Sequence, residues 1–105
     1  MIELNRENWE EEVVKAEGWV LVDFWSPKCE PCMALKPELE KLVDVYGDKI
    51  KFTALDITGA RRLAIQEKVL GLPVVAFYQQ GKKEFDLTGD ITVAEVEKKI
   101  KEILG

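Results

Sequence analysis

Apolar runs alternate with amphipathic stretches along the chain, and this pattern predicts alternating strands and helices. The run Trp19–Trp25 is nearly continuous in apolar, β-favouring residues, which is typical of a central strand buried on both faces. A helix is expected to begin at Pro31 and to end at Gly47. Pro37 lies inside that helix and should kink it. The apolar side of this helix is expected to consist of Met33, Leu35, Leu39, Leu42 and Val43.

The same pattern places the remaining elements. A helix capped by Asn5 is expected over roughly 7–15, a strand over 50–57 and a short helix over about 60–68. Two further strands, joined by a turn at Gln80-Gly81, form a predicted β-hairpin over 74–87, and residues 93–104 form the last helix. The order is close to βαβαβαββα. Together with the length of 105 residues, it predicts one α/β domain over 1–105, with a mixed sheet and helices on both faces.

The composition narrows the functions open to the chain. Its 20 acidic and 15 basic residues give a formal net charge of -5 and form no basic block, so nucleic acid is not an expected partner. No apolar run approaches the ~20 residues needed to span a bilayer, and the N-terminus lacks the features of a secretion signal. A cytoplasmic protein with no membrane segment is therefore expected. The absence of histidine removes the commonest general base and the commonest metal ligand.

The chemistry at neutral pH therefore depends chiefly on the two cysteines. Cys29 and Cys32 are separated by Glu30 and Pro31, across a turn that leads into a predicted helix N-terminus. The unpaired N–H groups and the positive dipole end of that helix would stabilise a thiolate at Cys29. A thiolate attacks disulfides, and the second thiol, one turn further along, can attack the mixed disulfide that results. A redox-active dithiol is the leading interpretation.

Three other interpretations of the cysteine pair carry less weight. A zinc site usually has four ligands, and the chain has no further cysteine and no histidine to complete one, so no metal is expected. A purely structural disulfide is disfavoured in a reducing compartment. Two unreactive buried cysteines are the third alternative.

Asp23 lies between Val22 and Phe24 in the predicted central strand. An unpaired charge is costly there, so its pKa should be raised, and the functional interpretation is a carboxyl poised for proton transfer. The alternative is an aspartate at a strand end that reaches water.

The whole chain resembles the thioredoxin family. The resemblance is carried by Val22-Asp23-Phe24-Trp25, Cys29-x-Pro31-Cys32, Pro37, Leu72-Pro73 and Gly81. It implies the thioredoxin fold, with a mixed sheet of four or five strands flanked by helices on both faces and the dithiol at the carboxyl-side edge of the sheet. It also implies that Cys29 is the exposed nucleophile, that Cys32 is the buried resolving thiol and that Asp23 moves a proton to or from Cys32.

The resemblance also indicates how substrate is held. Pro73 would be a cis-proline that faces the disulfide and supports a bound substrate chain, although the residues alone favour an ordinary trans-proline opening a strand. Trp25 would pack beside the dithiol, whereas Trp9 and Trp19 are expected to be ordinary packing residues. The residues expected at the substrate-binding surface are Trp25, Lys28, Glu30, Pro31, Leu72 and Pro73.

Four positions depart from the usual family pattern. Lys28 and Glu30 stand where most thioredoxins have Trp and Gly, Ala54 stands where many have a lysine near the buried carboxyl, and Val74 stands where threonine is frequent. These changes bear on substrate range and redox potential more than on reaction type. The stretch 60–65, followed by 70–73, is similar to thioredoxins that serve amino-acid reductase systems of anaerobic bacteria.

The function implied by the resemblance is that of a general protein-disulfide reductant. It would be a monomer that acts on protein disulfides, is recycled by a flavin-dependent thioredoxin reductase and needs no bound cofactor. One alternative is a disulfide-forming or isomerising relative, since Lys28 would stabilise the Cys29 thiolate and make the disulfide more oxidising. Another is a binding module in a larger reductase assembly, with incidental redox chemistry.

Overall fold

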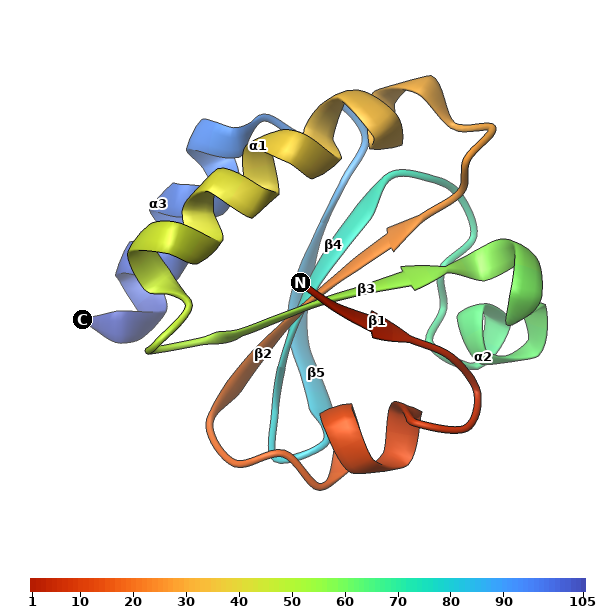
Figure 1. The fold of residues 1–105 in the computed structure, drawn as a ribbon, viewed down its shortest axis with the longest axis horizontal. Helices are drawn as coiled ribbons and strands as arrows, with labels where there is room; N and C mark the ends of the chain where they lie inside the picture. The colour runs from red at the N-terminus through yellow and green to blue at the C-terminus, as the bar shows by residue number, and fades with distance from the viewer.

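A computed structural model describes residues 1–105, which form a five-stranded mixed sheet with helices on both faces (Figure 1). In chain order the elements are β1 (Ile2–Leu4), a π-helical turn (Glu10–Val14), β2 (Trp19–Trp25), α1 (Glu30–Tyr46), β3 (Lys51–Asp56), a 3-10 turn (Ile57–Gly59), α2 (Arg61–Gln66), β4 (Val74–Gln79), β5 (Lys82–Thr88) and α3 (Val93–Leu104). The spatial order of the strands is β1-β3-β2-β4-β5. The predicted fold class is therefore confirmed, with β2 at the centre.

The position of β2 explains its continuous apolar run. It pairs in parallel with β3 and antiparallel with β4, so neither of its edges is free. Its side chains alternate between the two faces of the sheet, and helices cover both faces. Val22 packs in one core layer with Trp9 and Ala64, while Leu21 packs in the other with Leu39 and Ile100.

The two core layers lie under different helices (Figure 1). α1 and α3 cover one face of the sheet, and α2 and the π-helical turn cover the other. α3 begins with a capping box, in which Thr92 and Glu95 each accept a hydrogen bond from the other's backbone N–H. None of the helices has both the length and the apolar composition needed to cross a membrane.

The hairpin turn has the backbone that its sequence predicts. Gln80 and Gly81 have φ angles of 55° and 78°. Two successive residues with positive φ form a turn whose twist matches that of the flanking strands, and glycine adopts this conformation without a steric penalty. β4 and β5 are therefore joined tightly, and this fixes the register of the edge strand β5 against β4.

The first helix differs from the prediction over 7–15. Only Glu10–Val14 form a helical turn there, and it is of the π type. Asn5 nevertheless acts as the expected cap, because its side-chain oxygen accepts hydrogen bonds from the N–H groups of Glu7 and Asn8, both at 2.8 Å. The expected element order begins with a strand, but the pattern assigned no residues to it. β1 has only three residues, too few for a visible alternation.

Two further expectations were wrong in detail. The helix expected to run to position 68 ends at Gln66, and Lys68 adopts a positive φ of 62° that no helix continues. Met33 was placed on the apolar side of α1, but 45% of its surface is exposed. The buried stripe of α1 runs through Cys32, Leu35, Leu39 and Leu42. Met33 follows Cys32 directly, and the 100° step between successive helical residues turns it away from the sheet.

Candidate functional site

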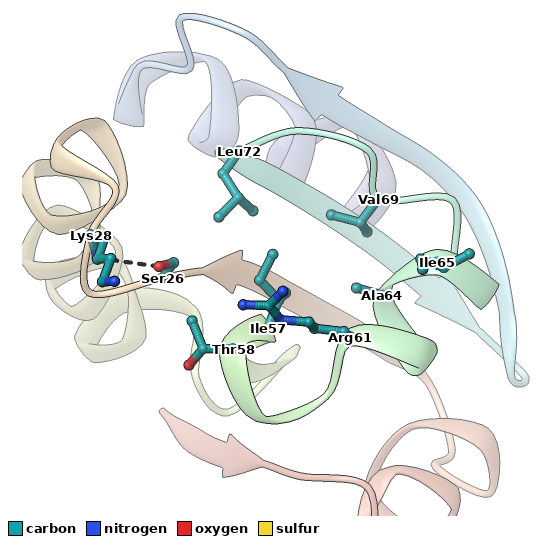
Figure 2. Close-up of a pocket in the computed structure, with 9 residues that line it drawn as sticks. All are labelled: Ser26, Lys28, Ile57, Thr58, Arg61, Ala64, Ile65, Val69 and Leu72. Atoms are coloured by element: carbon teal, nitrogen blue, oxygen red, sulfur yellow. Dashed lines mark hydrogen bonds between the residues drawn. The ribbon is translucent and has the colours of Figure 1, made fainter.

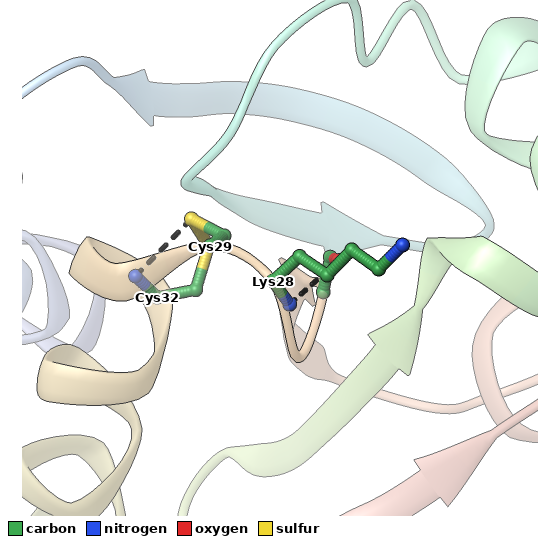
Figure 3. Close-up of a disulfide and its surroundings, with 4 residues drawn as sticks. Lys28, Cys29 and Cys32 are labelled. Atoms are coloured by element: carbon green, nitrogen blue, oxygen red, sulfur yellow. Dashed lines mark hydrogen bonds between the residues drawn. A yellow bond between two sulfur atoms is a disulfide. The ribbon is translucent and has the colours of Figure 1, made fainter.

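Cys29 and Cys32 form a disulfide across the first turn of α1, with their Cα atoms 5.2 Å apart (Figure 3). Cys29 is the N-cap of the helix, and its Sγ accepts a hydrogen bond of 3.3 Å from the backbone N–H of Cys32. A helical N–H group aimed at Sγ stabilises negative charge on that sulfur. Cys29 is half-buried, whereas Cys32 is completely buried. One sulfur is therefore accessible from solvent, and the other is shielded beneath it.

Asp23 is the one buried carboxyl group of the chain, and none of its surface is exposed. It stands opposite Ala54 on β3 and Val75 on β4, and neither of its carboxyl oxygens has a hydrogen-bond partner. Burial raises the pKa of Asp23 from its ordinary value of 3.8 to about 7, and the positive charge of Lys36 partly offsets this rise. The expectation of a raised pKa is confirmed, and the alternative that Asp23 reaches water is wrong.

Asp23 faces the same helix that carries the dithiol. Asp23 and Leu21 point to the same side of β2, because side chains two apart on a strand share a face. Leu21 packs with Leu35 of α1 in one core layer. α1 also runs back along β2, so its first turn, which holds Cys32, lies over the end of β2 that holds Asp23 (Figure 1). A carboxyl group whose pKa is raised to about 7 thus lies on the face of β2 that α1 covers.

Lys36 belongs to this site, although the sequence reasoning did not single it out. Its ammonium lies 4.1 Å from the centre of the Trp25 ring, which is a cation–π distance. Lys36 follows Cys32 by four positions, so both residues lie on one side of α1. That spacing was the signal available in the sequence. Lys36 supplies a positive charge near Asp23. The residue opposite Asp23 on β3 is Ala54, which carries no charge.

The Leu72–Pro73 peptide bond is cis, and Pro73 is buried immediately before β4. The structure thus agrees with the geometry that the family resemblance implied, and not with the trans form that the residues alone favoured. Leu72 is half-buried and lines a pocket beside the dithiol loop.

The remaining residues expected at the substrate-binding surface surround the dithiol. Trp25 is half-buried at the end of β2, while Glu30 and Pro31 are exposed on the first turn of α1. The backbone N–H of Lys28 donates a hydrogen bond of 3.2 Å to Ser26, and its side chain extends away from the disulfide (Figure 3). This orientation weakens the expectation that Lys28 stabilises the Cys29 thiolate.

A pocket of about 390 Å³ opens beside Lys28 (Figure 2). It lies between the loop after β2, the 3-10 turn after β3, α2 and the segment before β4, and its lining includes Ile57, Arg61, Ile65 and Leu72. Sequence reasoning missed Ile57 and Arg61 as site residues. β2 and β3 are parallel, so the segments that follow them emerge at the same edge of the sheet, and this rule could have indicated Ile57.

A dithiol at a helix N-terminus, on the carboxyl edge of a mixed sheet, defines a thiol-disulfide oxidoreductase. No group of three or more potential metal ligands is present. The Thioredoxin family model matches residues 1–102, and the chain belongs to the thioredoxin family.

Relatives that are named thioredoxins agree with this assignment. A thioredoxin of Acetoanaerobium sticklandii is 50% identical over 105 residues, which covers 99% of this chain and 100% of that protein. A thioredoxin of Peptoclostridium acidaminophilum is 41% identical over 95 residues, which covers 90% of this chain and 86% of that protein. A thioredoxin of Tissierella creatinophila is 72% identical over 39 residues, which covers 37% of this chain and 89% of that protein.

Proposed function

We propose that the protein is a general protein-disulfide reductant in which Cys29 is the nucleophile and Cys32 is the resolving thiol. The observation that carries this assignment is the difference in exposure between the two sulfurs, because an incoming protein disulfide can reach Cys29 and cannot reach Cys32. The hydrogen bond from the helix N-terminus to the Cys29 Sγ also supports it.

The reaction proceeds through a mixed disulfide. The Cys29 thiolate attacks one substrate sulfur, so a Cys29–substrate S–S bond forms, the substrate disulfide breaks, and a first substrate thiolate leaves and takes up a proton. Cys32 then loses its proton and attacks the Cys29 sulfur, which breaks the mixed disulfide and releases the second substrate thiol. Two electrons and two protons pass to the substrate, and the protein is left as the Cys29–Cys32 disulfide.

Asp23 is proposed to accept the proton that Cys32 loses. The carboxyl is buried on the α1 side of the sheet, has no hydrogen-bond partner and has a pKa raised to about 7. A base whose pKa lies near the working pH is ionised often enough to take a proton and weak enough to return it. Asp23→Asn is expected to slow the release of reduced substrate more than it slows the initial attack.

The substrate chain is proposed to lie across the dithiol. Pro73 and Leu72 would support it on one side, because they lead into β4, which neighbours β2. Its other contacts would come from the residues that surround the dithiol: Trp25, Lys28, Glu30 and Pro31.

A thioredoxin reductase is proposed to return two electrons and two protons to the disulfide, so the cycle requires no cofactor bound to this chain. We expect a cytoplasmic monomer. A redox titration against glutathione separates this function from that of a disulfide-forming relative: a potential well below the glutathione poise supports the reductant, and one well above it supports the oxidant.

The assignment of the two sulfurs is tested with insulin as the disulfide substrate. Cys29→Ser should abolish reduction, whereas Cys32→Ser should still attack and accumulate a covalent complex that mass spectrometry detects. The matched double variant, with both cysteines replaced by serine, should form no complex. A covalent complex through Cys32 in the Cys29→Ser variant would reverse the assignment, and full turnover in that variant would refute the mechanism.

A further inference from the structure

The pocket beside the dithiol has an apolar wall and cationic side chains around it (Figure 2). Ile57 and Leu72 form part of the apolar wall. Lys28 and Arg61 are exposed and come from different elements, the loop after β2 and the start of α2. Neither cation forms an ion pair within the chain. Both are therefore free to pair with a group on a bound molecule.

The charge reverses on the other side of the dithiol turn. A second hollow, of about 310 Å³, is lined by Pro31 together with Asp90, which has no ion pair, and Glu38, which pairs with Lys41 at 3.0 Å. Glu30 is also exposed on this first turn of α1. Two free cations thus line one side of the dithiol and the unpaired carboxylate of Asp90 lines the other, in a chain whose net charge is -5.

We propose that the pocket lined by Lys28 and Arg61, here called the Arg61 pocket, selects substrate segments that carry an acidic side chain beside the cysteine under attack. The proposal rests on the function proposed above and names its substrate class. The carboxylate would pair with Lys28 and Arg61, and neighbouring apolar groups of the segment would contact Ile57 and Leu72. An acidic side chain on the opposite flank would face Asp90 and would gain nothing.

The expected preference is modest because both cations are exposed. One exposed ion pair changes an affinity by about threefold or less, so two cations should favour an acidic over a neutral residue by about three- to tenfold at low salt. The preference should largely disappear at about 0.5 M salt, where the screening length is shorter than the pocket.

The test uses disulfide-linked peptides of one sequence, with Asp, Asn or Lys beside the cysteine, on its N-terminal or its C-terminal side. The measurement is the second-order rate constant for their reduction by the reduced protein in single turnovers. On one of the two sides, Asp should react about three- to tenfold faster than Asn, and Lys should react more slowly than Asn. Insulin reduction is followed in parallel as a substrate that is independent of the peptide design.

Variants of two adjacent arginines separate the pocket from general surface charge. Arg61→Gln should lower the Asp-to-Asn rate ratio by about threefold, and Arg61→Glu should lower it to about one or below, because Lys28 remains in the pocket. Arg62→Gln is the matched control, because Arg62 is the next residue of α2 and is also exposed, but it does not line the pocket. Its ratio should equal that of the unmodified protein.

Three results would overturn the proposal. Equal rates for all peptides, with insulin still reduced, would refute the Arg61 pocket and leave the proposed function standing. An equal loss of preference in Arg62→Gln and Arg61→Gln would assign the selectivity to overall charge. Failure to reduce any peptide or insulin would refute the proposed function, and the pocket proposal with it.

Discussion

The ammonium of Lys36 lies 4.1 Å from the centre of the Trp25 ring. Trp25 follows the buried Asp23 by two positions on β2, so the two side chains share a face of the strand. The positive charge of Lys36 opposes the rise in the pKa of Asp23 that burial causes. Many thioredoxins carry a lysine on β3 opposite this carboxyl, where this chain has Ala54. Here α1 supplies the cation instead, from the helix that also carries the dithiol.

Lys36→Met should raise the pKa of Asp23 further above about 7, because the attraction that favours its charged form is removed. The measurement is a pH titration of the Asp23 carboxyl carbon by nuclear magnetic resonance in the oxidised protein. Lys41→Met is the control, since Lys41 lies on the same helix with 75% of its side chain exposed. An unchanged Asp23 pKa in Lys36→Met would show that the charge of Lys36 does not act on this carboxyl.

A cation restored on β3 should compensate for the loss of Lys36. A hollow of about 200 Å³ lies beside Ala54 and Trp25 and offers space for a longer side chain. The double variant Lys36→Met with Ala54→Lys should therefore have a lower Asp23 pKa than Lys36→Met alone. The same titration measures it, and an equal pKa in the two proteins would show that a cation at position 54 does not reach the carboxyl.

Asp23 should make the protein less stable as the pH rises. Well below pH 3.8 the carboxyl is protonated in both states, so no charge is buried on folding. Between 3.8 and about 7 the unfolded chain has released this proton while the folded chain retains it, so the free energy of unfolding falls with pH. A shift of this size corresponds to about 4 kcal/mol at ~1.36 kcal/mol per pKa unit, and the full penalty applies above pH 7.

Asp23→Asn removes this titration, so the variant should lose about 4 kcal/mol less stability than the unmodified protein between pH 4 and pH 8. Urea unfolding of both oxidised proteins at the two pH values measures the difference. The other titrating groups are shared and cancel in the comparison. Identical pH dependence in the two proteins would contradict a raised pKa at Asp23.

The parts of the site that the sequence predicted are those in which a residue conflicts with its local pattern. Asp23 is a charge inside an apolar run, and Cys29 and Cys32 are reactive groups at a helix start. Lys36 was missed because a lysine on an amphipathic helix fits the pattern of a solvated face. Its role depends on packing between α1 and Trp25, which only the folded chain brings together.

The fold was predictable to a similar extent. β2 and α3 lie where the apolar pattern predicts them. The pattern distinguishes the two elements because side chains repeat every two residues in a strand and every 3.6 residues in a helix. The π-helical turn at Glu10–Val14 was not predictable, since its apolar spacing is also that of an α-helix over one or two turns. The Arg61 pocket was missed because four separate segments form it.

Alkylation should distinguish the two sulfurs of the reduced protein. Iodoacetamide at neutral pH should modify Cys29 before Cys32, because Cys29 is half-buried and accepts the helical N–H, whereas Cys32 has no exposed surface. Peptide mapping by mass spectrometry after partial labelling gives the order. Preferential labelling of Cys32 would contradict the assignment of the nucleophile.

The hairpin turn at Gly81 should tolerate alanine less well than the loop at Gly89. Both glycines have a positive φ, of 78° and 80°, so alanine at either position costs about 1 kcal/mol of backbone strain. A Cβ at Gly81 would also lie 2.9 Å from the backbone oxygen of Val14, whereas a Cβ at Gly89 would have no atom within 4 Å. The difference between the two variants therefore isolates the contact between the hairpin and the π-helical turn.

Gly89→Ala should lower the free energy of unfolding by about 1 kcal/mol. Gly81→Ala should lower it by about 2–4 kcal/mol, because backbone atoms of Val14 cannot rotate away as a side chain would, so one of the two segments has to shift. Urea unfolding at a single pH measures both losses, and equal slopes of free energy against urea would show that the unfolded states are comparable. Equal losses in the two variants would mean that the turn moves away from Val14 at no cost, and that the π-helical turn does not constrain the hairpin.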